Sequence, residues 1–399
     1  MALEPNQLTK GMEKIAEEIF KHCKYGKQSE NLANGALACG QFYGDNVKNR
    51  IQRGLHGTSA AISILLASQK QEYVDIAKKL LIYTKNRQTY DPQNVDDDLN
   101  TIKQAETLMA LNNLADDPQY LQSLKDRLLN KQNASDGSWS HFFDDNTPSE
   151  EATCYAVLSL HNKISPEKLI KSKEYLWKKQ EALLDKSKSS DIYAIAIRSL
   201  ILYTLASCQS NDANSLYTPK QLITEVKNLW NICRPEYRSD FEVTVEYYRK
   251  DKNQYLRLPW QIYLAHALLL TNNTYFYSKR FQRFLLILYQ AAKENGGYKY
   301  QHEGIFLSTR TNAILYRFFD YAKSITPHKA TITKLTDDFL EAWSHSWIRT
   351  GVILALGFRF LTWSNQWKEL LNDQSPLWGD FIGALVISAL SWLYSTGRR

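Results

Sequence analysis

The sequence lacks the short motifs that mark several common enzyme classes. Its 399 residues contain no Gly-rich phosphate loop, no G-x-S-x-G element and no H-E-x-x-H pair, so nucleotide hydrolysis, serine hydrolysis and zinc proteolysis have no sequence support. Cysteine is rare and shows neither C-x-x-C nor zinc-type spacing. We expect reduced, buried thiols in a reducing compartment, and no metal or cofactor. The five cysteines are Cys23, Cys39, Cys154, Cys208 and Cys233.

Strand signals are also scarce, and charge of one sign is only modestly in excess. One insert, at residues 241–258, alternates β-branched and aromatic residues around a charged K-D-K-N tip, which predicts a β-hairpin. The net charge of +7 suits an anionic membrane surface. It is too small and too scattered for nucleic-acid binding, so no nucleic-acid partner is expected.

What the sequence does contain is a repeated unit, in which a polar start precedes a helix of small and apolar residues. The starts of six such segments lie about 40 to 50 residues apart, with one gap of about 70, which is the spacing of paired-helix repeats. The insert at 241–258 accounts for the long gap. The six segments begin at Gly54, Leu99, Ser149, Ser190, Leu258 and Leu307.

A longer and more charged helical segment, able to face water on one side, precedes each of these segments. Three charged segments begin with an N-cap residue followed by proline, at Asp117-Pro118, Ser165-Pro166 and Thr218-Pro219, as expected at a helix start. Six outer and six inner helices in alternation predict an all-α fold, an (α/α)6 toroid over residues 1–330. An open solenoid is the alternative, and the count of six favours closure.

The composition changes after residue 330, which predicts a second domain at 331–399. Residues 347–363 and 378–394 are the most apolar stretches, each about 17 residues long, near the lower limit for crossing a bilayer. We predict a transmembrane-like helical hairpin of two short spans or two interfacial helices; two helices buried against the toroid are the alternative. Aromatic residues bracket both stretches, and Arg359 can extend to the headgroups. The predicted membrane residues are Trp347, Arg359, Trp363, Trp378, Trp392 and Tyr394.

The flanking charges predict an orientation for this hairpin. The chain ends in Gly-Arg-Arg, and its first residues do not resemble a signal peptide. By the positive-inside rule, we expect an inner (cytoplasmic) membrane location with a cytosolic N-terminal domain.

One repeat carries a family resemblance. Gln132, Asp136, Gly137, Ser138 and Trp139, followed by the helix A-T-C-Y-A-V-L-S-L, resemble the QW-type repeat of the terpenoid cyclase and protein prenyltransferase superfamily. The resemblance implies that the glutamine and the tryptophan tie neighbouring repeats together. It supports the toroid over residues 1–330, but this fold hosts many activities.

The catalytic signatures of that superfamily are incomplete here. Class II cyclases use an Asp-X-Asp-Asp acid, and the nearest match is Asn94-Val95-Asp96-Asp97 followed by Asp98. Adjacent buried carboxylates would raise one another's pKa, whereas a solvated acidic helix start is the plainer interpretation. The zinc-binding histidine of the prenyltransferases corresponds to Ala152, and a DDxxD motif is also missing.

The starts of the inner helices should line one mouth of the toroid. Paired carboxylates there could instead indicate glycan cleavage. His56 between glycines is interpreted as a capping or packing residue and Trp139 as a wedge between repeats, and His141 is the best lone ligand candidate. The candidate residues are His56, Asp96, Asp97, Asp98, Trp139, His141, Glu150, Glu151, Asp191, Trp260, Tyr298 and Arg310.

These observations favour a non-catalytic, membrane-tethered toroid. Its cytosolic barrel would bind a small ligand or a protein partner, and its hairpin would anchor to or perturb the lipid bilayer. One version is a bacterial antiviral defence effector that forms a homo-oligomer through the hairpin. The alternative is a membrane-associated isoprenoid enzyme, terpene cyclase- or prenyltransferase-like, with Asp96 or Asp97 as its acid.

Overall fold

The computed structural model describes residues 3–30, 32–43, 53–93, 95–111, 117–188, 190–209, 216–249, 252–298 and 307–325. The chain divides between Thr326 and Pro327 into two units. The predicted C-terminal hairpin, with its residues from Trp347 to Tyr394, lies outside the described residues. Within the ranges above, no helix is both long and apolar enough to cross a bilayer.

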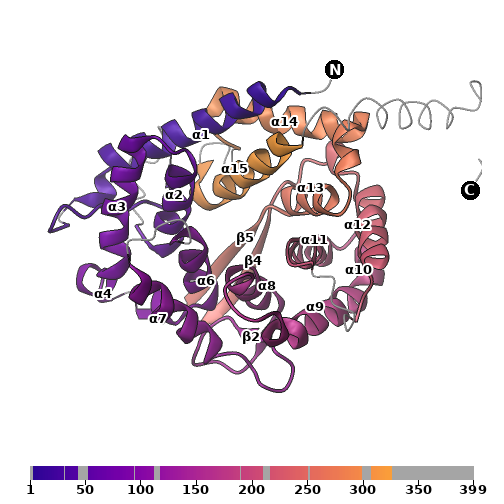
Figure 1. Cartoon of the computed structure of the whole chain (residues 1–399), viewed down its shortest axis with the longest axis horizontal. Coiled ribbons are helices and arrows are strands. Elements are labelled where there is room, and N and C mark those ends of the chain that lie inside the picture. Colours follow the sequence, from indigo (N-terminus) through magenta and orange to yellow (C-terminus); the bar gives the residue numbers. More distant parts are fainter. Residues whose placement is uncertain are drawn as a thin grey trace, which may run out of the picture. The chain divides into compact units, whose positions relative to one another are not determined.

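The described part is mostly helical, which confirms the all-α prediction. The six segments of small and apolar residues each form a helix: α2 (Leu55–Ala67), α6 (Thr101–Ala110), α8 (Glu150–Leu160), α11 (Ile192–Ser207), α13 (Trp260–Thr271) and α15 (Thr309–Ser324). Each packs against the next in sequence order, and α15 packs against α2. The six helices therefore form a closed cycle, visible at the centre of Figure 1.

A short antiparallel pairing joins the first and last repeats of this cycle. Strand β1 (Phe42–Tyr43) pairs with β6 (Leu307–Ser308). Next to it, the Thr309 amide donates to the Gln41 carbonyl at 3.0 Å, and the Thr309 hydroxyl donates to the Gly40 carbonyl at 2.8 Å. Backbone donors and acceptors at the two ends of the repeat array thus form hydrogen bonds with each other.

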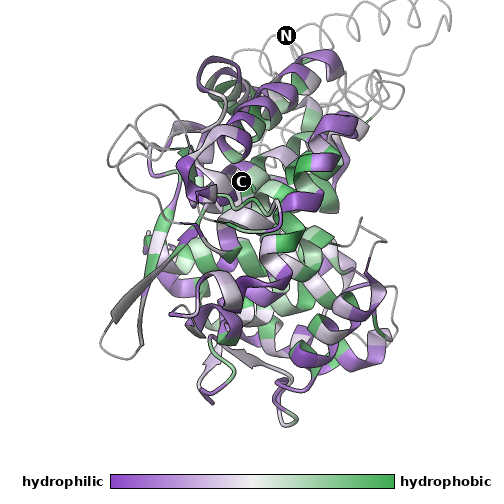
Figure 2. Ribbon diagram, turned by 90° about the vertical axis from the view of Figure 1, so that its left-hand side faces the viewer, coloured by the Kyte–Doolittle hydropathy of each residue, from purple (hydrophilic) through white to green (hydrophobic). Residues whose placement is uncertain are grey.

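The charged segments form a second layer of helices outside the cycle (Figure 1). Their apolar residues recur every three or four positions, as Leu8, Met12, Ile15 and Ile19 do in the first of them, and only that face is buried. Figure 2 shows hydrophilic residues on the outward faces of this layer. The outer helices are α1 (Pro5–Tyr25), α3 (Gln71–Lys85), α7 (Pro118–Leu129), α9 (Ile170–Ala182), α12 (Pro219–Cys233) and α14 (Lys279–Asn295).

Two of the three predicted helix starts are capped as expected, and one differs. Asp117 accepts from the Tyr120 amide, and Thr218 forms a capping box with Gln221. Ser165 makes no side-chain cap. Pro166 instead opens a 3-10 turn, and α9 starts only at Ile170. The short elements are α4 (Arg87–Tyr90), α5 (Val95–Leu99), α10 (Leu184–Lys188), η1 (Lys27–Ser29), η4 (Pro166–Leu169), η5 (Pro235–Tyr237) and η6 (Asn273–Tyr277).

The predicted β-hairpin is confirmed: β4 (Val243–Arg249) pairs antiparallel with β5 (Lys252–Leu258). In Figures 1 and 2 it lies across one end of the ring of helices. Its base is held by the Trp260 indole, which donates to the Asp240 carbonyl at 2.5 Å. A smaller pairing, β2 (Trp139–Ser140) with β3 (Pro148–Ser149), precedes α8.

Candidate functional site

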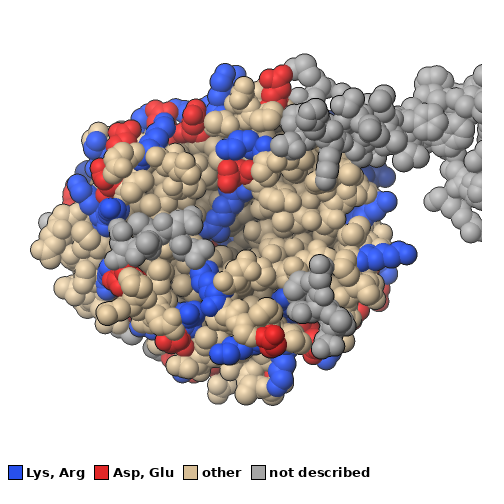
Figure 3. Space-filling view, viewed as in Figure 1, with Lys and Arg blue, Asp and Glu red and all other residues tan. Residues whose placement is uncertain are grey.

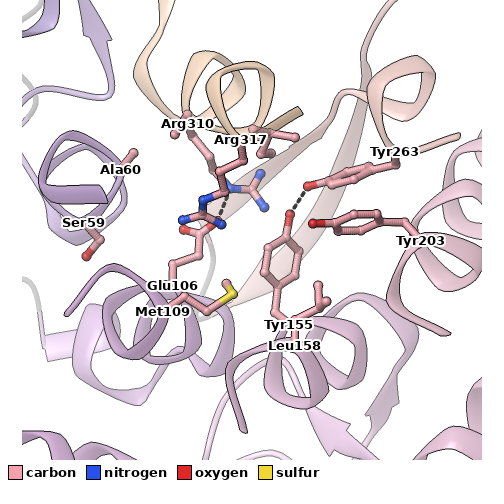
Figure 4. A pocket seen from close by; sticks show the side chains of 12 residues that line it. Ser59, Ala60, Glu106, Met109, Tyr155, Leu158, Tyr203, Tyr263, Arg310 and Arg317 are labelled. Carbon is pink, nitrogen blue, oxygen red and sulfur yellow. Dashed lines mark hydrogen bonds and ion pairs between the residues drawn. The ribbon is translucent and has the colours of Figure 1, made fainter. Parts of the chain in front are cut away.

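The closed cycle of inner helices surrounds a cavity of about 180 Å³. Charged, aromatic and apolar side chains from all six inner helices contribute to its wall, as Figure 4 shows. The charged groups come from α6 and α15, and the aromatic groups from α8, α11 and α13. The lining residues are Ser59, Ala60, Glu106, Met109, Tyr155, Leu158, Tyr203, Tyr263, Arg310, Ala313, Ile314 and Arg317.

Arg310, the second residue of α15, is the central cation of this wall. Its side chain is 8% exposed, and three neighbouring residues hold it in place. Its Nε donates to a carboxylate oxygen of Glu106, its Nη1 donates to the Arg257 carbonyl at 2.5 Å, and its guanidinium lies 4.9 Å from the centre of the Tyr155 ring. Its Nη2 is buried and has no hydrogen-bond partner among the described residues.

Glu106 joins Arg310 to His56. One carboxylate oxygen of Glu106 accepts from Arg310 and the other from the Nδ1 of His56. Burial alone would raise the pKa of Glu106, but the attraction and hydrogen bonds of Arg310 and His56 lower it to about 2. Burial lowers the pKa of His56 below its usual 6.5, against the opposing effect of Glu106. At pH 7 His56 is therefore neutral, and its Nδ1 carries the proton that the carboxylate accepts.

The cavity wall has one positive charge in excess, because Arg310 and Arg317 face a single carboxylate. Figure 4 shows the two guanidinium groups close together. Arg317 is half-buried and donates from Nη2 to the Ser63 hydroxyl at 2.9 Å. Figure 3 shows the ring hollowed at its centre, with Lys and Arg side chains on one wall of the hollow. An anion would satisfy both the excess charge and the unpaired Nη2 of Arg310.

Three tyrosines close the other side of the cavity. The hydroxyls of Tyr155 and Tyr263 are hydrogen-bonded to each other, and Tyr203 packs against Tyr263 with ring centres 5.3 Å apart. Burial raises the pKa of Tyr155 to about 12 and raises the pKa of Tyr203 and of Tyr263. All three stay neutral at pH 7, so they offer hydrogen bonds and aromatic surface and do not act as bases.

A second, polar cavity of about 520 Å³ lies beside the start of α2 and includes His56 in its wall. Its charges are paired: Arg53 binds Asp91 at 2.8 Å, and Lys103 binds Asp97 at 2.5 Å. His56 thus connects the two cavities. It lines the polar cavity, and its Nδ1 contacts Glu106, which lines the central cavity.

The predicted acidic cluster adjoins the second cavity through Asp97, and none of its residues lines the central one. Asp96, Asp97 and Asp98 belong to the short helix α5. Asp98 accepts two hydrogen bonds from Arg87, at 2.7 and 3.1 Å, and Asp97 binds Lys103. Because Asp97 and Asp98 are held in ion pairs, they fit the interpretation as charges at a helix start better than the interpretation as a protonated catalytic acid. Arg87 also lies 3.6 Å from a carboxylate oxygen of Asp97, so one guanidinium is shared by two of these acids.

The resemblance residues Gln132 and Trp139 connect repeats. The Gln132 amide donates to the Ser172 hydroxyl at 2.9 Å and to the Lys168 carbonyl at 3.1 Å, both in the next repeat. The indole of Trp139 is 1% exposed and donates to the Leu128 carbonyl at 2.8 Å. Trp139 is therefore buried between elements, as a wedge would be, and does not line the central cavity.

The remaining predicted site residues are dispersed. His141 lies 3.1 Å from the Ser149 hydroxyl, which also donates to Glu151, while Glu150 pairs with Lys179 on the outside. Asp191 caps α11. Trp260 is fully buried, and Tyr298 stacks on Phe241. Of all the candidates, only Arg310 lines the central cavity and only His56 and Asp97 line the polar one.

The sequence reasoning missed the other groups of the central cavity: Glu106, Tyr155, Tyr203, Tyr263 and Arg317. All five lie in the bodies of inner helices, whereas the predicted site residues lie mostly near the starts of those helices. A usable signal existed, because a glutamate in the small-residue helix of α6 and a second arginine in α15 are expensive to bury unless they are paired.

Comparison with known proteins adds no further assignment. No protein-family model matches the sequence, and no curated protein is significantly similar to it. Within the described part of the chain, no group of three or more His, Cys, Asp or Glu side chains is arranged to hold a metal ion.

Proposed function

We propose that residues 1–330 form an (α/α)6 toroid related to the terpenoid cyclases and protein prenyltransferases, and that it is a non-catalytic binding domain. Its ligand is a small molecule with one anionic group, held in the central cavity. The closed order of the inner helices and the inter-repeat contacts of Gln132 support the toroid.

The unpaired Nη2 of Arg310 is the observation that carries this proposal. A buried guanidinium nitrogen that donates no hydrogen bond destabilises the folded protein by about 1–3 kcal/mol. Glu106 already accepts from Arg310 and from His56, so it does not supply the missing acceptor. A ligand carboxylate or phosphate beside Arg310 and Arg317 would supply it and would offset the excess positive charge.

The size of the cavity limits the ligand. Its volume is about 180 Å³, below the about 300–1,000 Å³ of pockets for drug-sized molecules. It is close to the about 150 Å³ of a cavity that holds benzene. We therefore propose an anion with a body no larger than about one aromatic ring, resting on Tyr155, Leu158 and Ile314.

The same features give an isoprenoid enzyme less support. A long isoprenoid chain would need a larger cavity, and Asp97 and Asp98 are held in ion pairs with Lys103 and Arg87. Substitution of Asp96 and Asp97 by asparagine would abolish turnover if that alternative were correct.

We further propose that residues 331–399 attach the toroid to the inner membrane as a helical hairpin, with the toroid in the cytosol. The apolar stretches at 347–363 and 378–394 with their aromatic ends support this. In this proposal the protein is an effector of antiviral defence: ligand binding in the toroid controls oligomerisation of the hairpin and leakage of the bilayer.

Binding is tested with phenyl phosphate and benzoate as probes, against neutral benzamide and cationic benzylamine, by calorimetry and thermal unfolding. We expect the two anions alone to bind and to raise Tm. Arg317→Gln should weaken binding at least about tenfold, the loss of one charge-assisted hydrogen bond. Lys323→Gln, an equal charge change at a half-buried position of the same helix that does not line the cavity, should not. Equal binding of benzamide, or an unaffected Arg317→Gln protein, would refute an anion site.

Membrane attachment is tested by expressing the full chain and a chain ending at residue 335 in bacteria. Fractionation after a high-salt wash, which removes protein held at the membrane surface by charge, should leave only the full chain in the membrane fraction. Only the full chain should cause growth arrest and leakage in a dye-leak assay. Membrane association without leakage would remove the effector role while keeping the anchor. Two proteins that both stay out of the membrane fraction would reject the hairpin as a membrane element.

A further inference from the structure

The outer layer of helices carries one sector where large apolar side chains face solvent. On α14, Leu286 and Ile287 are each 41% exposed, and on the neighbouring segment Ile232 and Tyr237 are 45% and 61% exposed. These four account for half of the eight large hydrophobic side chains that are exposed in the described part of the chain. We call this surface, formed by residues 227–237 and the outward side of α14, the α12–α14 face.

Specific contacts hold the two parts of this face together. Arg283 of α14 lies over the Tyr237 ring at 4.7 Å. One turn earlier, Arg280 donates to Glu236 at 2.5 Å and to Asn231 at 3.0 Å. Beneath them, Trp230 packs on the Phe281 and Phe284 rings. The apolar side chains are therefore displayed on a fixed platform.

The charge around these side chains is almost entirely positive. Between residues 216–240 and along α14, six basic residues are exposed but only one acidic residue, Glu294. The acids Glu225 and Glu236 in these segments are paired with Arg198 and Arg280. Figure 3 shows Lys and Arg side chains along the right-hand rim, where α12 lies. The six exposed basic residues are Lys220, Lys227, Arg234, Lys279, Arg283 and Lys293.

Helices α7 and α3 of the outer layer do not share this combination. On α7 the exposed charges are one acid and one base, Asp126 and Arg127, and no large apolar side chain is exposed there. On α3, the exposed Glu72 and Asp75 accompany three exposed lysines, again without an exposed large apolar residue. An outer helix of this fold therefore does not need to expose Leu286 and Ile287 for its own stability.

We propose that the α12–α14 face binds the surface of an anionic lipid bilayer. A helix that presents apolar residues among Lys and Arg lies in a membrane interface, with its apolar side chains among the acyl chains and its cations at the headgroups. Leu286, Ile287 and Tyr237 enter the interface, and Arg283 and Lys279 contact lipid phosphates. This contact sets the orientation of the toroid on the membrane, and it does not depend on residues 331–399.

A single fluorescent label tests this contact in the full chain. All five native cysteines are buried, so a cysteine introduced at exposed Gln290, on the same side of α14, can be labelled selectively with an environment-sensitive dye such as NBD. A label at Gln122, exposed on α7, is the control. The probes are vesicles of phosphatidylcholine alone and vesicles that also contain phosphatidylglycerol.

We expect a blue shift at position 290 with the anionic vesicles only, and none at position 122. Lys279→Glu with Arg283→Glu should weaken the response about tenfold or more. Lys78→Glu with Lys79→Glu, the same charge change at exposed positions of α3, should leave it intact. Leu286→Ser with Ile287→Ser should abolish the shift, with unchanged circular dichroism as the check on folding.

Three results would overturn the proposal. They are no shift at position 290, an equal shift with neutral vesicles, and a shift without vesicles, which would identify a second protein copy as the occupant. Vesicle sedimentation of the same samples detects attachment through either region, whereas the shift at position 290 reports this face alone. A protein that sediments with vesicles but shows no shift at 290 would therefore refute this face while leaving the anchor in place.

Discussion

Arg310 and Glu106 form a buried ion pair between α15 and α6, across 204 positions of sequence. Their side chains are 8% and 11% exposed, so water screens the pair little. The pair crosses the ring of inner helices and also supplies the charged wall of the cavity. Stability and the proposed ligand binding therefore share the same two residues.

Glu106→Gln should destabilise the protein by about 3–5 kcal/mol, because it leaves Arg310 buried without its counter-ion. Urea unfolding at pH 7 measures the loss. Glu181→Gln, at an exposed position of α9, should change stability by less than about 0.5 kcal/mol. The double substitution Glu106→Leu with Arg310→Met should recover part of the loss. If Glu106→Gln changes the free energy of unfolding as little as Glu181→Gln does, the ion pair contributes little to stability.

Acid should destabilise the fold through His266. This imidazole is packed among the rings of Tyr203, Phe318 and Tyr321, and burial, helped by Arg317, lowers its pKa to about 3. Between that value and about 6.5 only the unfolded chain binds the proton, so stability falls as pH falls, by about 1.4 kcal/mol per unit. His266→Phe should flatten this part of the curve in urea titrations. An unchanged slope would contradict the assignment.

Glu242→Gln should stabilise the protein at neutral pH. Glu242 precedes β4, accepts from the Thr311 hydroxyl, and its other oxygen is buried without a hydrogen-bond partner among the described residues. Burial raises its pKa above 4.5, so the folded state keeps a proton that the unfolded chain loses. Stability therefore falls as pH rises through 4.5 towards the folded pKa. The variant should remove that loss in thermal unfolding, and a lower Tm at pH 7 would refute it.

Gly137→Ala should be strongly destabilising. Gly137 has φ +75°, and an added Cβ would lie 2.6 Å from the Ser172 amide nitrogen, in the backbone of the next repeat. Gly35 has a similar φ of +68° but open space around it, so Gly35→Ala isolates the backbone strain. We expect about 1 kcal/mol for Gly35→Ala and several times more for Gly137→Ala. Equal losses of stability would mean that the backbone around Ser172 shifts at little cost to accommodate the added Cβ.

Much of the secondary structure could be predicted from the sequence. Small and apolar residues on nearly all sides identify α11 and α13 as interior helices, and one-sided periodicity identifies α1 and α14 as exterior ones. These patterns lie within single segments, so they can be recognised without knowing which residues are neighbours in space. Ser165 shows the limit, because the same Ser-Pro signal can open a 3-10 turn in place of an α-helix.

The candidate site could not be predicted in the same way. Arg310 lies at the start of an inner helix, which the sequence marks, but Glu106, Tyr155 and Tyr263 have no local feature that places them together. Their meeting depends on the order in which six helices close around a centre. The acidic run at Asp96–Asp98 is the more conspicuous feature of the sequence, yet Asp98 and Asp97 are paired with Arg87 and Lys103.

The sequence by itself thus determined the helices, their inner and outer layers and the hairpin at 243–258, because each depends on periodicity or turn chemistry within one segment. Only the tertiary structure decided which side chains face the cavity, which charges are paired and which donor is left open at Arg310. Those properties depend on distances between residues far apart in the chain, and no local pattern encodes them.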